Sequence, residues 1–204
     1  MFRGAERMYI SKKSPKMSTE KRSDISHIEE LAWFAMSATF GRSMKAKAFL
    51  ESKQVKCFVP MRYEIIKDKT QGSVKKLVPA INNLIFVNTT KERIQTLKTT
   101  IEYLQYLTHP IGGRNVPIIV PEEQMQQFIA VCDTHDEGLT YLSPVEINLE
   151  KGTPVKIIGS AFDGVVGTFV KVQNSRKKRV VVLVQGVTAV MLAEFTDGYL
   201  QPLK

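Results

Sequence analysis

The C-terminal segment constrains the fold most, because its composition leaves room for little except short strands and tight turns. Residues 151–204 are rich in β-branched side chains, and Gly159, Gly164 and Gly167 interrupt the apolar runs. β-branched residues favour strands, and glycine permits a sharp reversal between two of them. So short a sheet must pair its edges to avoid open strands. We therefore predict a small antiparallel β-barrel over residues 151–204.

An acidic stretch precedes this segment. Residues 132–150 contain no lysine or arginine, and Gly138 and Pro144 interrupt any regular element. The negative charges are Asp133, Asp136, Glu137, Glu146 and Glu150. Such a break between two basic regions is typical of a linker. We predict an acidic linker over residues 132–150 and a domain boundary on each side of it.

Residues 31–131 alternate between strand-like and helix-like patterns. The apolar, β-rich runs predict strands at 31–37, 55–60, 84–88 and 103–109, whereas residues 67–76 read as a charged hairpin loop. Helical spacing predicts helices at 42–53, 91–99 and 121–131, the first with Met44, Ala48 and either Phe49 or Leu50 on its apolar face. This order indicates an α+β fold, an α/β sandwich with an antiparallel sheet and flanking helices.

The charge of the chain favours a polyanionic partner. The formal net charge is +9, and residues 1–30 are basic and poor in periodic apolar positions. This composition cannot bury enough apolar surface to offset the entropy of ordering. We expect residues 1–30 to form a flexible basic arm, and nucleic acid, or a surface next to it, to be the partner.

Several classes of protein lack support in the sequence. Cys57 and Cys132 stand far apart and outside any CxxC pair, so neither a zinc site nor a disulfide framework is indicated. His27, His109 and His135 have no surroundings typical of a triad or a metal site. No apolar run is long enough to span a bilayer. We expect a cytoplasmic, monomeric protein with no cofactor, no metal, no membrane contact and no enzymatic activity.

Two motifs together resemble a known family. Gly159, Phe162, Gly164 and Gly167 have the spacing of the KOW motif, which is found in NusG-type factors and some ribosomal proteins. A generic SH3-like barrel with a similar turn is the alternative. In residues 31–131, the Trp33–Phe34 pair, Gly41, VKCFVPM at 55–61 and KKLVPAINNLIFV at 75–87 resemble the NusG N-terminal domain and its paralogue RfaH. The resemblance covers residues 31–203 and implies a NusG-like α/β sandwich followed by a KOW barrel.

The resemblance narrows further to the UpxY-type paralogues of Bacteroidetes, through PAINNLIFV, VPEEQMQQF and NSRKKRVVV. Those paralogues are antiterminators of capsular polysaccharide loci. The implied function is therefore an elongation and antitermination factor that binds RNA polymerase and promotes readthrough of selected operons.

The resemblance also implies a docking face for the clamp helices of the largest polymerase subunit. The matching positions are Phe34, Leu77, Val78, Pro79, Leu84 and Phe86. Ordinary core packing is the alternative for each of them. Ile81 and Asn82 look inserted relative to the family, and Leu84 takes the place of an aromatic residue, so we expect a reshaped face.

Basic side chains form the expected nucleic-acid surface, toward upstream or non-template DNA. They are Arg42, Lys45, Lys67, Lys69, Lys75 and Lys76. Lysine and arginine neutralise phosphates, although a solvated charged face is the alternative for any single lysine. Thr39 and Phe40 stand where RfaH has basic residues, which is a departure from that relative.

The C-terminal domain carries the last set of expected contacts, with a small-subunit ribosomal protein or nascent RNA. The residues are Phe162, Asp163, Val165, Arg176, Lys177, Lys178 and Arg179. Asp163 and Val165 differ from general NusG and weigh against recruitment of Rho. The alternative function is a ribosome- or RNA-binding KOW protein, which explains the charge but not residues 33–87.

Overall fold

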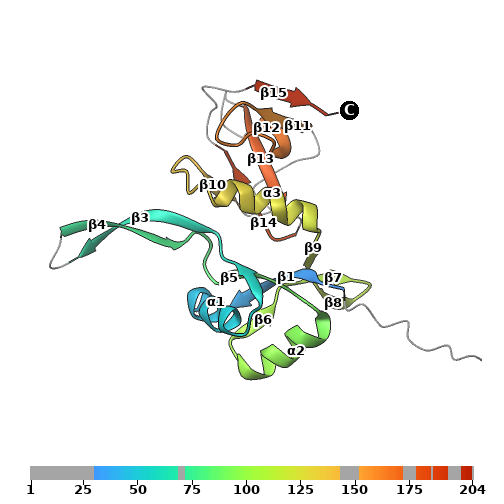
Figure 1. The fold of residues 1–204 in the computed structure, drawn as a ribbon. Coiled ribbons are helices and arrows are strands. Elements are labelled where there is room, and N and C mark those ends of the chain that lie inside the picture. Colours follow the sequence, from blue (N-terminus) through green and yellow to red (C-terminus); the bar gives the residue numbers. More distant parts are fainter. Residues whose placement is uncertain are drawn as a thin grey trace, which may run out of the picture.

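The structure is a computed structural model, and it describes residues 30–68, 72–142, 152–171, 178–184, 186–192 and 199–203 (Figure 1). The expected flexible N-terminal segment, residues 1–30, lies outside the described residues, except for Glu30. Residues 143–150 of the expected acidic linker also lie outside them.

The N-terminal half is built around an antiparallel sheet whose central strand is β1 (Ala32–Ala38). Its other strands are β2 (Lys56–Phe58), β5 (Leu84–Thr89), β6 (Leu104–Tyr106) and β9 (Ile119–Val120). The strand order is β2-β5-β1-β6, and β9 also pairs with β1. The predicted strands around residues 31–37, 55–60 and 84–88 are thereby confirmed.

Both faces of this sheet are buried, which explains why β1 and β5 are almost continuously apolar. Alternate side chains of a strand point to opposite faces. Phe34 and Met36 belong to one core cluster, together with Leu50 and Ile94 from two helices described below. Trp33, on the other face, belongs to a second cluster.

Helices α1 (Ser43–Ser52) and α2 (Lys91–Thr100) cover the Phe34 face. The Thr90 hydroxyl caps α2 by accepting a hydrogen bond from the backbone N–H of Arg93 at 3.2 Å. The buried positions of α1 are Ser43, Ala46 and Leu50. Leu50 is buried, as one of the predicted alternatives, whereas Met44 and Ala48, which were predicted to share its face, are exposed. The spacing had predicted a helix but not its rotation, which follows from where the helix begins.

The third described helix, α3 (Glu122–Cys132), lies between the two halves of the molecule (Figure 1). Its Phe128 ring packs edge-on against Phe86 and Phe58, with centroids 5.7 and 6.1 Å away. Trp33 donates its indole N–H to Glu122 Oε2 at 2.7 Å, which joins the first turn of α3 to β1.

The C-terminal half is a six-stranded antiparallel sheet. Its strands are β10 (Thr140–Leu142), β11 (Thr153–Ile158), β12 (Val166–Lys171), β13 (Lys178–Val184), β14 (Thr188–Met191) and β15 (Tyr199–Pro202). They are ordered β10-β14-β13-β12-β11-β15. The predicted antiparallel strands are confirmed. Strand β10 comes from the acidic stretch and pairs with β14.

A single apolar cluster joins the two halves through α3. It contains Phe86 of the N-terminal sheet, Met125 and Phe128 of α3, and Val182 and Val190 of the C-terminal sheet. One polar contact supports it, since the backbone N–H of Val166 donates to Gln127 Oε1 at 2.8 Å. The C-terminal sheet therefore rests on α3, and α3 rests on the N-terminal sheet.

Two hairpins extend from these layers. Strands β3 (Met61–Asp68) and β4 (Gly72–Pro79) pair over their whole length and form a long ribbon, here called the arm (Figure 1). Strands β7 (Thr108–Ile111) and β8 (Arg114–Pro117) form the shorter hairpin. The expected loop at 67–76 was too long, because residues 72–76 lie in β4 and pair with residues 64–68.

Candidate interaction surfaces

The arm presents large apolar side chains to solvent. Tyr63 pairs with Leu77 across the two strands, and Ile65 lies two residues further along β3, so all three share one face. Their exposed fractions are 46%, 41% and 72% for Tyr63, Leu77 and Ile65. We call these three residues the arm stripe. A contiguous exposed apolar stripe on a projecting ribbon is typical of an interaction surface.

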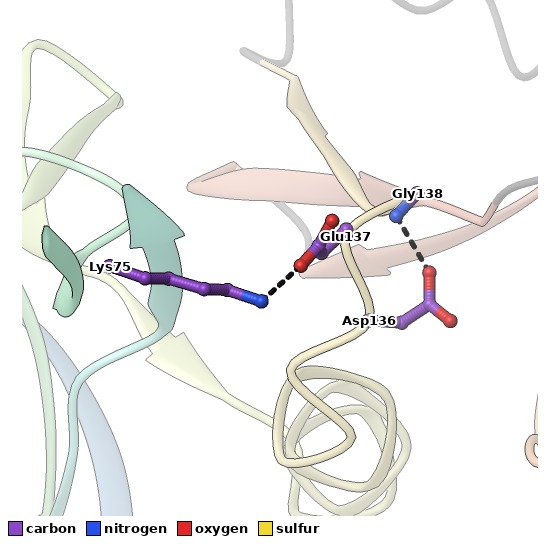
Figure 2. Close-up of polar contacts among 4 residues, drawn as sticks. All are labelled: Lys75, Asp136, Glu137 and Gly138. Atoms are coloured by element: carbon purple, nitrogen blue, oxygen red, sulfur yellow. Dashed lines mark hydrogen bonds and ion pairs between the residues drawn. The ribbon is translucent and has the colours of Figure 1, made fainter. Parts of the chain in front are cut away.

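Lys75 stands opposite Ile65 and therefore lies on the same face as the arm stripe. Its ammonium group is 4.4 Å from the centroid of the Tyr63 ring. It also donates to Glu137 Oε1, which follows α3 in the chain (Figure 2). This contact raises the pKa of Lys75 and lowers the pKa of Glu137.

The turn that carries Glu137 is internally braced. Asp136 Oδ1 accepts a hydrogen bond from the backbone N–H of Gly138 at 2.7 Å (Figure 2). Two further contacts reach the arm. The His135 ring lies 6.1 Å from the Tyr63 ring, and the Tyr141 hydroxyl donates to the carbonyl of Met61 at 3.2 Å. The base of the arm is therefore tethered to the segment between α3 and β10.

The other expected basic residues of the arm are spread over both of its faces. Lys76 pairs with Glu64 in the register, on the face opposite Lys75. Lys67 and Lys76 are exposed, and among the described residues neither forms an ion pair. Lys69 lies outside the described residues.

The structure divides the expected polymerase-docking residues into three groups. Leu77 is exposed on the arm, and Val78 and Pro79 beside it are half-buried. Leu84 and Phe86 are 4% and 0% exposed, in the cluster that includes α3. Phe34, at 3% exposed, lies on the opposite face of the sheet, among α1 and α2. The geometry therefore separates the three arm residues from the buried Leu84 and Phe86, and both from Phe34.

Arg42 and Lys45, the expected nucleic-acid residues near α1, gather around one aromatic ring. The Arg42 guanidinium carbon lies 5.1 Å from the Tyr103 centroid, and the Lys45 ammonium nitrogen lies 5.8 Å from it. Phe40, just before the helix, is 84% exposed. The sequence pattern pointed to the two cations but not to the two aromatic rings beside them.

Among the described partner residues expected in the C-terminal half, two are buried and Asp163 is exposed. Phe162 and Val165 are 8% and 5% exposed and belong to the shared apolar cluster. Asp163 Oδ1 accepts from the backbone N–H of Gly159 at 2.7 Å and so closes the turn after β11. Arg179 is half-buried in β13. Arg176, Lys177 and the side chain of Lys178 lie outside the described residues.

Burial makes both thiols poorly reactive. It raises the pKa of Cys57 to about 11 and that of Cys132 to about 12, so both stay protonated near neutral pH. In the parts of the chain that the structure describes, no group of three or more His, Cys, Asp or Glu side chains is placed to hold a metal ion. No helix in those parts has the length and apolarity needed to cross a membrane.

Two comparisons with known proteins found a similar family and a similar structure. The family profile described as "Transcription termination factor nusG" matches residues 31–129. A solved structure described as "Domain interaction in Thermotoga maritima NusG" is similar, with 18% sequence identity and a TM-score of 0.39, over 80% of this chain and 94% of that chain. No curated protein matches the sequence significantly. The matched range runs from the residue before β1 into α3, so this part of the chain is similar to that family.

Proposed function

We propose that this protein is a transcription elongation factor that docks on RNA polymerase through the arm stripe. The observation that carries the proposal is the exposed row of Tyr63, Ile65 and Leu77 on a ribbon that projects from the part of the chain similar to the NusG family. Leaving such side chains in water forgoes the stabilisation that burial gives. A partner surface that covers them explains their position.

The chemistry of the arm also fits a partner that works on nucleic acid. Lys67 and Lys76 are exposed and form no ion pair among the described residues, on the same ribbon as the apolar row that we assign to docking. A protein docked there brings these ammonium groups near the anionic DNA that polymerase holds. In the proposed complex Val78 and Pro79 extend the docking surface, whereas Leu84 and Phe86 are buried in the core and act through the stability of the sheet.

The proposed partner on polymerase is the pair of clamp helices of the largest subunit, as the family resemblance implies. The proposed outcome is antitermination of selected operons, in particular those for capsular or surface polysaccharide. We further propose that the C-terminal sheet is a KOW barrel that binds a small-subunit ribosomal protein or nascent RNA. The resemblance to UpxY-type paralogues supports these finer assignments.

Retention of the full chain on core RNA polymerase is the direct test. We expect retention at moderate salt, and a loss of at least several-fold when Ile65 and Leu77 are both changed to Ser. Ile111→Ser is the matched control, because Ile111 is 55% exposed on the other hairpin, β7–β8. Wild-type protein that is not retained, or equal losses for the control and the arm variant, would contradict the docking assignment.

Transcription on a template from the gene's own operon tests the outcome of docking. We expect readthrough of a terminator to increase when the protein is present, and the arm variant to lose this effect. An unchanged pattern of pauses and termination would contradict the antitermination role. Retention on ribosomes in place of polymerase would favour the alternative, a ribosome-binding KOW protein.

A further inference from the structure

A groove lies between the arm and the turn that joins α3 to β10. Its volume is about 630 Å³, within the range of pockets that hold a ligand. Four consecutive residues of β3, 62–65, line one side, and Asp136, Glu137 and Leu139 line the other. Alternate side chains of a strand point to opposite faces. A groove that touches four residues in a row therefore runs along the edge of β3.

This edge of β3 is open to another strand. Among the described residues β3 pairs with β4 alone. The carbonyl of Met61 accepts from the hydroxyl of Tyr141, which belongs to β10, so it points away from β4. Paired and unpaired positions alternate along an antiparallel strand. Tyr63 and Ile65, which alternate with Met61, therefore turn their backbone N–H and C=O groups outward, where an added strand can bond to them.

A lysine of the chain itself shows which kind of side chain the groove holds. The Lys75 ammonium group lies 4.4 Å from the centroid of the Tyr63 ring and pairs with Glu137 (Figure 2). The side chains of Lys75 and Glu137 are 51% and 71% exposed, so a competing cation can reach the pair. Within the described ranges Asp136, on the same turn, forms no ion pair. An aromatic face beside two carboxylates attracts a cation.

We propose that this groove binds an extended basic segment of a partner protein. The segment adds as a strand to the outer edge of β3, and one of its lysine or arginine side chains replaces Lys75 between Tyr63 and Glu137. Backbone pairing supplies affinity in this mode of recognition, and the pocket for a side chain supplies specificity. The inference goes beyond polymerase docking, because it shares Tyr63 and Ile65 with the arm stripe but assigns a different ligand to the edge beside them.

Binding of a labelled peptide to the full chain, followed by fluorescence anisotropy at moderate salt, tests the proposal. The probe alternates arginine and valine and has the length of β3, 8 residues. Two variants break the same ion pair and should act in opposite directions. Glu137→Gln removes the carboxylate that the peptide needs and should weaken binding roughly two- to fivefold, as for an exposed ion pair. Lys75→Gln removes the competing cation and should tighten binding by about twofold or more.

Charge-matched controls separate the groove from the overall charge of the protein. Lys76→Gln makes the same change in net charge as Lys75→Gln, but Lys76 lies on the opposite face of the arm. Glu102→Gln matches Glu137→Gln, and Glu102 is exposed just before β6. Both controls should bind the basic peptide as the wild type does. A peptide that alternates glutamate and valine should show no measurable binding to the wild type.

N-methylation of the basic peptide tests the added strand. A strand presents alternate backbone N–H groups to the strand beside it. Methyl groups on one alternate set of residues should therefore weaken binding by at least about fivefold, as for the loss of two hydrogen bonds. Methyl groups on the other set should have little effect. Equal losses from the two sets would show that the peptide does not pair with β3.

An affinity that moves in the same direction in Lys75→Gln and Glu137→Gln would overturn the inference, because the ion pair would then serve only to brace the arm. Equal tightening in Lys75→Gln and Lys76→Gln, or equal binding of the acidic and basic peptides, would overturn it as well. Retention on core polymerase keeps the two proposals apart. Wild-type protein that is retained but binds no basic peptide rejects the groove alone, whereas peptide binding without retention rejects the docking proposal.

Discussion

Strands β4 and β5 follow each other in the chain but differ in how far their apolar side chains are buried. Leu77 in β4 is 41% exposed, whereas Phe86 in β5 is fully buried. The difference comes from what lies against each strand. Strand β5 has strands on both sides and helices on both faces, whereas β4 pairs only with β3. An apolar residue therefore stabilises the fold in β5 and remains available to a partner in β4.

The largest loss of stability is expected from a substitution in β5, the buried strand of the two. Phe86→Ala removes a ring that packs against Phe128 in the cluster shared by both halves. Truncating a buried phenylalanine lowers the free energy of unfolding by about 3–5 kcal/mol. Denaturant titration measures this loss. The paired variant Leu77→Ala should change the unfolding free energy by less than about 1 kcal/mol. Similar losses in the two variants would contradict the contrast between the strands.

A second large effect is expected at the close approach of β12 and β13. A Cβ on Gly167 would lie 2.7 Å from Val180 Cγ1 and 2.9 Å from the carbonyl oxygen of Val181. The backbone atom cannot move without disturbing the ladder, so Gly167→Ala should destabilise the protein by about 1–3 kcal/mol. Thermal unfolding compares it with Thr168→Ala, its neighbour in β12. An unfolding temperature of Gly167→Ala that is not lower than that of Thr168→Ala would show that β12 and β13 do not pack this closely in solution.

The covered parts of the fold were largely predictable from sequence. Strands β1 and β5 are buried on both faces, so their continuous apolar runs gave the correct element type. Helix α3 has Pro121 at its start and acidic residues in its first turn, which are typical start signals. The length of the arm was not predicted. The arm is held together by backbone pairing between β3 and β4, and not by a pattern of buried residues that the sequence would show.

The interaction surfaces were less predictable, for a related reason. Arg42 and Lys45 were predicted because charged residues can be identified directly from the sequence, and both are exposed in the structure. Phe34 and Phe86 have similar sequence contexts but lie on opposite faces of the sheet, since alternate residues of paired strands face opposite ways. Phe40 was noted only as a departure from RfaH, and Ile65 was not noted as a surface residue, because exposure of an apolar residue depends on which elements leave it uncovered.

A substitution in the exposed arm is expected to change stability only slightly. Ile65→Ser changes a side chain that is 72% exposed on β3, and surface substitutions of this kind stay within about 0.5 kcal/mol of the wild type. The same variant should lose polymerase retention, because Ile65 is the most exposed member of the arm stripe. Unfolding and retention measured on one preparation separate the two readouts. A large loss of stability would show that the arm packs against the body in solution.

The smallest effect concerns the tether between Lys75 and Glu137. Hydrogen bonding to Lys75 lowers the pKa of Glu137, so the contact stabilises at pH above the ordinary range of a glutamate and is lost as pH falls through the lowered value. Lys75 sets the upper end of the pH range. Its pKa is raised, and the contact is lost as pH rises through the raised pKa. Neutral pH lies between these limits, where the tether is intact.

Glu137→Gln should therefore release the base of the arm at neutral pH, with almost no change in unfolding free energy because exposed ion pairs contribute little. Hydrogen exchange of the β3 and β4 amides measures the release. We expect faster exchange in Glu137→Gln at neutral pH, and equal exchange in both proteins at a pH low enough to protonate Glu137. Asp136→Asn is the control, because Asp136 bonds within its own turn to Gly138 and not to the arm. Identical exchange at neutral pH would mean that the Tyr141 contact to Met61 suffices to hold the arm without the ion pair.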